Sequence, residues 1–120
     1  MLDLIDGETA LTEEVRAIPT PGHSPGHMSL LISSRGQEAL IMADVAAHPA
    51  MVTEESWTYI FEADPAQAIA TRRRVLDGLA DSGMPVLVGH YPAPSFGRIV
   101  REGGHRYWQP ADPTDLTPPR

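Results

Sequence analysis

The apolar residues of this chain fall into short runs separated by glycine, proline and charged residues. Residues 2–5 and 15–19 are two such runs on either side of a turn-rich stretch, which predicts a short β-hairpin. Residues 28–33 are almost wholly apolar, and a turn at residues 34–37 separates them from a further run at residues 38–43. This pattern predicts a second hairpin that is buried on at least one face.

A different pattern begins at Asp64, which is suited to the N-cap of a helix. Pro65 then fits the first helical position, and Gln67 stands three residues after the cap. Gly83 is placed for the C-terminal cap. Apolar residues recur between them on one helical stripe, at Ile69, Leu76, Leu79 and Ala80. These signals predict one amphipathic helix that covers a face of the sheet.

The remaining apolar segments predict one more strand, at residues 84–89, and a closing hairpin formed by residues 96–101 and 105–108. The expected fold class is α/β (α+β), with a mixed, mostly antiparallel sheet and a long helix on one face. We expect one domain over residues 1–110, followed by a frayed, proline-rich tail at residues 111–120.

Residues that can bind a metal stand at the ends of three predicted strands. His23 lies in the turn of residues 20–27, which proline stiffens and in which glycine permits close backbone approach. Asp44 and His90 each come directly after an apolar run. Any one of these residues alone is more typical of a turn or a cap. Together they give the sheet three potential ligands.

Composition narrows the classes of function. The chain has 16 acidic and 9 basic residues, a net charge of −7, and every basic residue is arginine. Nucleic acid is therefore a poor partner. Arg72, Arg73 and Arg74 are consecutive on the predicted helix, so their side chains point to different faces of it. This indicates solvated charge plus one buried ion pair, and the alternative is a binding patch. Without cysteine, histidine and carboxylate are the strong metal ligands that remain.

The sequence gives no sign of a membrane or export segment. No window approaches the roughly 18 apolar residues of a membrane span, and the acidic N-terminus lacks the basic start of a signal peptide. We therefore expect a cytoplasmic protein whose partner is a small-molecule substrate rather than a membrane.

The three strand-end ligands, in this order, resemble the second half of the metallo-β-lactamase fold hydrolases. The likeness extends from about residue 2 to residue 110 and is sharpest toward the methyl parathion hydrolase and quorum-quenching lactonase branch. The segments that carry it are Ala43-Asp44-Val45, His48-Pro49, Phe61, Asp64, Thr71-Arg72, His90-Tyr91-Pro92 and Phe96-Gly97. The resemblance implies the C-terminal half of an αββα sandwich, with His23 on one metal, Asp44 bridging two metals and His90 on the other.

By this resemblance the chain is a metal-dependent hydrolase that cleaves an ester, lactone or phosphotriester bond with a metal-activated water. Zinc fits the nitrogen and oxygen ligands best, and manganese, cobalt or iron are open alternatives. A mononuclear site made of His23, Asp44 and His90 is a further possibility.

The chain departs from the family pattern in one respect. Members of the family carry an upstream H-x-H-x-D-H motif, whereas the histidines here are His23, His27, His48, His90 and His105, no two of them two residues apart. We therefore expect a truncated C-terminal half whose sheet leaves one apolar face uncovered, so that it forms a homodimer or associates with a missing N-terminal half. The competing hypothesis is a non-catalytic remnant or dimerising module with at most one weak metal site.

Several further residues are candidates for supporting roles. His27 is expected to contact the backbone or a metal-ligating carboxylate rather than the metal itself. The family likeness suggests a substrate pocket, with a surface or packing role as the alternative for His48 and core packing as the alternative for Trp57, Phe61 and Tyr91. The pocket candidates are His48, Trp57, Phe61, Tyr91 and Phe96.

Overall fold

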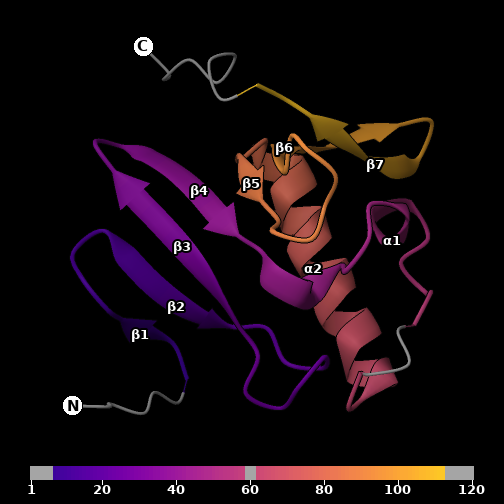
Figure 1. The fold of residues 1–120 in the computed structure, drawn as a ribbon, viewed down its shortest axis with the longest axis horizontal. Helices are drawn as coiled ribbons and strands as arrows, with labels where there is room; N and C mark the ends of the chain where they lie inside the picture. The colour runs from indigo at the N-terminus through magenta and orange to yellow at the C-terminus, as the bar shows by residue number, and fades with distance from the viewer. Residues whose placement is uncertain (1–6, 59–61, 113–120) are drawn as a thin grey trace.

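The computed structural model describes residues 7–58 and 62–112. In them a seven-stranded sheet is built in the order β1-β2-β3-β4-β5-β6-β7 (Figure 1). Its strands are β1 (Thr9–Ala10), β2 (Val15–Pro19), β3 (Met28–Ser34), β4 (Gln37–Ile41), β5 (Val86–Leu87), β6 (Phe96–Glu102) and β7 (His105–Pro110). Every neighbouring pair is antiparallel except β4 and β5, which run parallel. This confirms the mixed, mostly antiparallel sheet.

Two of the hairpins turn through residues with positive φ. Arg35 and Gly36 link β3 to β4 with φ of 54° and 76°, and Gly103 and Gly104 link β6 to β7 with φ of 59° and 81°. Two successive positive φ values match the twist of the flanking strands, which is why such short turns close hairpins. The hairpins predicted around these turns are confirmed.

Two strands differ from the sequence prediction. On the side away from β3, strand β2 pairs with the short strand β1, whereas the expected run at residues 2–5 lies outside the described residues. The strand expected at residues 84–89 is reduced to Val86–Leu87 in β5. Beyond it, the amide of Val88 still donates to the Ser95 carbonyl, but the chain then turns away.

The long helix α2 (Pro65–Ser82) begins and ends where its caps predict. The Asp64 side chain accepts a hydrogen bond from the Gln67 amide at 3.0 Å, and Gly83 ends the helix with φ of 68°. Helix α2 connects β4 to β5, so these strands can run parallel. The connection also contains the 3₁₀ turn η1 (Ala43–Val45) and helix α1 (Ala50–Thr53), which packs against β7. None of the described helices is long and apolar enough to cross a bilayer.

One face of the sheet packs against α2 and forms the core. Leu40 of β4 and Val86 of β5 are buried there with Leu76 and Leu79 of the helix. The residues next to them in the strands point to the other face, because side chains alternate along a strand. In this second face, which we call the open face, Leu30, Ile41, Leu87 and Phe96 lie in register across four strands. Leu87 remains 37% exposed.

A buried guanidinium attaches the connection between β4 and α2 to the helix. Arg72 is fully buried, and its Nε donates to the Val45 carbonyl at 2.8 Å. One Nη donates to the Glu55 and Trp57 carbonyls at 2.7 and 2.8 Å, and the other pairs with the Glu62 carboxylate at 2.6 Å. Burial lowers the pKa of Arg72, and the neighbouring Glu62 opposes this effect. The arginine run thus contains a buried ion pair, as its position on the helix indicated.

Replacing Arg72 with methionine should destabilise the protein by about 3–5 kcal/mol, because the buried Glu62 carboxylate and three carbonyls lose their donor. The matched control is Arg74→Met, which removes an exposed arginine two residues away and should change the free energy of unfolding by less than about 0.5 kcal/mol. Urea denaturation of both variants measures the difference, and equal losses would contradict a special role for Arg72.

Candidate functional site

The turn of residues 20–27 is a closed loop that presents His23. The Thr20 amide donates to the His27 carbonyl at 2.9 Å, and the His27 amide donates to the Ser24 carbonyl at 3.2 Å. Three successive carbonyls of the turn accept hydrogen bonds from α2 and the two residues before it: Pro21 from the Thr71 hydroxyl (2.6 Å), Gly22 from the Asp64 amide (3.0 Å) and His23 from the Ala63 amide (3.0 Å). The helix therefore fixes the backbone of His23.

Glycine at position 22 allows this close contact. Its φ is 136°, which side-chain-bearing residues rarely adopt, and a Cβ there would lie 2.3 Å from the backbone N and Cα of Ala68. Gly26 in the same turn has open space around its Cα. Only the first of these two glycines is therefore required by packing.

The parallel pairing of β4 and β5 brings Asp44 and His90 to one edge of the sheet. Ile41 pairs with Leu87, and each candidate ligand follows three residues after its member of this pair. Because parallel strands end at the same edge, the two side chains emerge close together.

The structure brings His23, Asp44 and His90 together around the Asp44 carboxylate. His23 Nε2 lies 3.4 Å from Asp44 Oδ2, and His90 Nε2 lies 3.3 Å from Asp44 Oδ1. The side chain of His23 is 23% exposed, whereas that of His90 is 71% exposed. The imidazoles contact different oxygens, and among residues 7–58 and 62–112 no group of three or more His, Cys, Asp or Glu forms a ready metal site.

His27 lies behind this cluster and binds backbone with both ring nitrogens. Its Nε2 accepts the Asp44 amide hydrogen at 3.0 Å. That nitrogen therefore carries no proton, so Nδ1 carries one and donates to the Thr20 carbonyl at 2.9 Å. Burial lowers the pKa of His27 and favours this neutral form, although the hydrogen bond to Thr20 and the nearby Asp44 carboxylate oppose the shift. His27 thus fixes the backbone of Asp44.

Two candidates for the substrate pocket make internal contacts. Tyr91 is buried, its hydroxyl donates to the Ala46 carbonyl at 2.8 Å, and its ring stands edge-on to Trp108 with centroids 5.0 Å apart. Burial raises the pKa of Tyr91. His48 is exposed, and its Nδ1 accepts the Ala50 amide hydrogen at 3.1 Å. The packing alternative describes Tyr91 better than a contact with substrate does.

The other aromatic candidates are spread out. Trp57 is 55% exposed and its carbonyl binds Arg72. Phe96 belongs to the open face and lines a cavity of about 260 Å³ together with Ile32 and Ala39, and none of the three candidate ligands lines that cavity. Phe61 lies outside the described residues.

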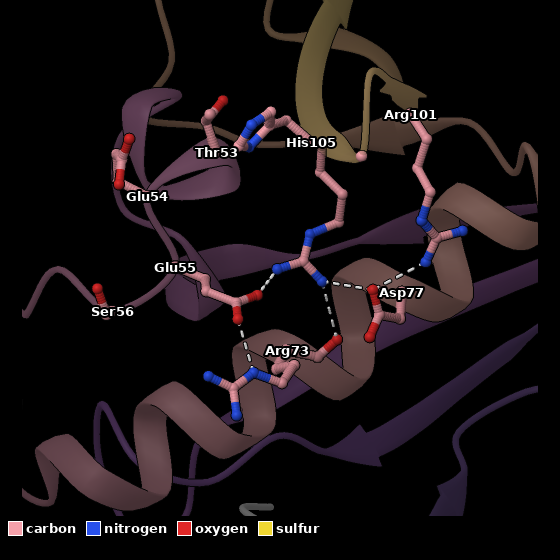
Figure 2. A pocket seen from close by; sticks show the side chains of 10 residues that line it. Thr53, Glu54, Glu55, Ser56, Arg73, Asp77, Arg101 and His105 are labelled. Carbon is pink, nitrogen blue, oxygen red and sulfur yellow. Dashed lines mark hydrogen bonds and ion pairs between the residues drawn. The ribbon is translucent and has the colours of Figure 1, made fainter.

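A second concavity of about 460 Å³, the charged cleft, lies between α1, α2 and the β6–β7 hairpin (Figure 2). Its charges are arranged in pairs: Arg73 with Glu55 (2.6 Å), Arg106 with Glu55 and with Asp77 (2.6 Å), and Arg101 with Asp77 (2.8 Å) and Asp81. Sequence reasoning did not identify this cluster, whose members come from distant segments. Because its carboxylates face arginines, the charged cleft is suited to holding the hairpin on the helix.

No protein-family model matches the chain. Solved structures do match it. AidC, a dizinc quorum-quenching lactonase in complex with a product, is 25% identical with a TM-score of 0.82 and covers 90% of this chain. The hydrolase AbOPH of the β-lactamase superfamily is 23% identical with a TM-score of 0.78 and 84% coverage. An N-acyl homoserine lactone hydrolase with product at its catalytic metal centre is 26% identical with a TM-score of 0.62 and 74% coverage.

These matches define the class of fold. The chain has the fold of the metallo-β-lactamase superfamily hydrolases, quorum-quenching lactonases among them, which confirms the resemblance seen in its sequence. The chain spans only 35–37% of the length of these three structures.

We expect Gly22→Ala to destabilise the protein by about 3 kcal/mol or more, because the new methyl group meets helix backbone and the φ is unfavourable. Gly26→Ala is the control and should change stability by less than about 1 kcal/mol. Thermal unfolding compares the two, and a tolerated Gly22→Ala would show that the turn is not pressed against α2.

Proposed function

We propose that this chain forms the metal-binding edge of a metal-dependent hydrolase in which the Asp44 carboxylate bridges two divalent cations. His23 binds the cation on the Oδ2 side, and His90 binds the cation on the Oδ1 side. The observation that carries the proposal is the pair of distances from the two imidazoles to opposite oxygens of one carboxylate, 3.4 and 3.3 Å. Two ligands on one tetrahedral zinc ion stand about 3.3 Å apart, so each pair fits one cation.

The donor chemistry agrees with zinc. Imidazole and carboxylate suit zinc, and also manganese, cobalt or iron. From the described residues, each cation position receives one imidazole nitrogen and one carboxylate oxygen. Further ligands therefore come from other polypeptide or from water. The similarity to a dizinc lactonase supports this assignment.

The proposed reaction is hydrolysis of a lactone, ester or phosphotriester. Bound cations supply an activated water and stabilise negative charge on the substrate oxygen. The protein residues hold this centre in place: the carboxylate of Asp44 neutralises and joins the cations, and the turn fixed by α2 orients His23. Lactones are the first substrates to test, because two matched structures are lactone hydrolases.

The open face provides the place for the remaining ligands. Two members of its apolar row, Ile41 and Leu87, stand three residues before Asp44 and His90. A segment that covers this face thus reaches the site as well. We propose that its occupant is the other half of an αββα hydrolase, which supplies both an apolar cover and the additional histidines. The solved structures, nearly three times as long as the matched portion, support this assignment.

The second candidate function is a non-catalytic module that associates through the open face. It is favoured by the small number of donors, two for each cation position, that the described residues provide. Metal binding and hydrolysis by this chain distinguish the two functions.

We predict that the purified chain binds zinc and that Asp44→Asn weakens binding at least tenfold, because an amide cannot neutralise two cations. Asp81→Asn, which alters an exposed carboxylate paired with Arg101, is the control and should bind zinc as the unaltered chain does. Calorimetric titration measures both. Less than a tenth of an equivalent of zinc on the unaltered chain, or equal affinity in Asp44→Asn, would contradict the proposed site.

Hydrolysis of a lactone, an aryl ester and a phosphotriester should be measured with the same zinc-loaded proteins. We expect Asp44→Asn to lower the rate at least a hundredfold and Asp81→Asn to leave it unchanged. Equal rates in all three proteins would favour the non-catalytic module.

Association through the open face should appear in size-exclusion chromatography as a dimer or larger species of the isolated chain. Leu87→Glu places a charge on this face and should increase the monomer fraction. Leu11→Glu changes another exposed leucine, 46% exposed and outside the apolar row, and should leave the elution unchanged. A clean, thermostable monomer of the unaltered chain would contradict the proposed use of the face.

A further inference from the structure

Three successive residues after β4 are each held by a side chain from another part of the fold. The amide of Asp44 donates to His27 Nε2 at 3.0 Å. The carbonyl of Val45 accepts from Arg72 at 2.8 Å, and that of Ala46 accepts from the Tyr91 hydroxyl at 2.8 Å. The bonds join residues 17, 27 and 45 positions apart in the sequence.

These bonds connect the segments that carry the candidate ligands. His27 belongs to the turn that presents His23, and Tyr91 directly follows His90. The segment of Asp44 is therefore tied to the segments of both histidines. The bonds of His27 and Tyr91 thus each join two segments that carry candidate ligands.

The backbone at this point is strained. Ala43, directly before Asp44, has φ of 54°, in the left-handed region that residues with a side chain rarely adopt. Such a conformation persists where surrounding contacts over-determine it. The three side-chain bonds provide that constraint.

The His27 end of the arrangement is itself fixed by buried hydroxyl groups. Thr20 Oγ1 lies 2.8 Å from His27 Nδ1 and 3.0 Å from Ser29 Oγ, and the Ser29 hydroxyl donates to the Met42 carbonyl at 3.2 Å. Thr20 and Ser29 are 3% and 1% exposed. These contacts link the Met42 carbonyl to the Asp44 amide through Ser29, Thr20 and His27. They therefore hold the residues on both sides of Ala43.

We infer that Tyr91 is a positioning residue whose hydroxyl, acting through the Ala46 carbonyl, holds the Asp44 carboxylate in register with His90. The functional value of this position rests on the proposed metal site, whereas the bond itself does not require a metal. Contact with substrate and core packing were both open for Tyr91 in the sequence, and in the structure its hydroxyl has a backbone partner.

The test uses Tyr91→Phe, which removes the hydroxyl but keeps the ring that contacts Trp108. The control, Tyr107→Phe, removes the hydroxyl of a tyrosine that is 41% exposed on β7. Amide hydrogen exchange in the metal-free proteins should be about tenfold faster at Asp44 in Tyr91→Phe, because loss of one buried hydrogen bond favours local opening. The Leu79 amide in α2 should exchange at an unchanged rate.

Cobalt(II) binding, followed by its visible absorption, provides the second readout. Tyr91→Phe should bind cobalt about 10–100-fold more weakly with an altered spectrum, and Tyr107→Phe should match the unaltered chain. Unchanged exchange at Asp44, or equal acceleration at Asp44 and Leu79, would overturn the inference. If Asp44 exchanges faster but the unaltered chain binds no cobalt, the positioning role stands and the proposed metal function fails.

Discussion

The burial of one guanidinium constrains much of this fold. Arg72 is inaccessible to solvent, so each of its donors needs a partner inside the protein. The partners come from the connection between β4 and α2, which otherwise has little regular structure. By binding this connection, Arg72 attaches the residue after Asp44 to the same helix that fixes the turn of His23. A single helix is thus the common support of two candidate ligands.

The third candidate ligand is positioned by topology. Because α2 crosses from β4 to β5, the two strands run parallel and end at one edge. His90 and Asp44 are brought together by this edge, and the hydroxyl of Tyr91 then links their segments. The imidazoles approach the Asp44 carboxylate from opposite oxygens, a geometry suited to a carboxylate shared between two cations. The open face adjoins this edge, because Ile41 and Leu87 stand three residues before Asp44 and His90.

Local signals in the sequence predicted much of this structure. Helix α2 could be placed to the residue, because an N-cap aspartate, a first-turn proline and a C-terminal glycine each act within a few residues. The hairpins could be predicted because their turns contain glycine between apolar runs. Asp44 and His90 were identified because each follows an apolar run, and His23 because it lies in a turn stiffened by proline. The family resemblance grouped the three residues.

Contacts between distant segments could not be predicted in the same way. The bond from His27 to the Asp44 amide and the bond from Tyr91 to Ala46 depend on how strands are arranged, and no local pattern encodes them. Arg72 did leave a signal: it stands four residues after Ala68 and four before Leu76, both buried, so a charged residue interrupts the apolar face of the helix. The sequence indicated one buried ion pair in this run, but not its carbonyl partners.

The central claim is that His23, Asp44 and His90 jointly bind cations. Anomalous diffraction at the zinc absorption edge, from crystals of the chain grown with zinc, tests it most directly. The account predicts anomalous peaks on the two sides of the Asp44 carboxylate, each at about 2.0–2.2 Å from one of its oxygens and one imidazole Nε2. Ordered zinc bound only elsewhere on the protein, with these three side chains free of metal, would contradict it.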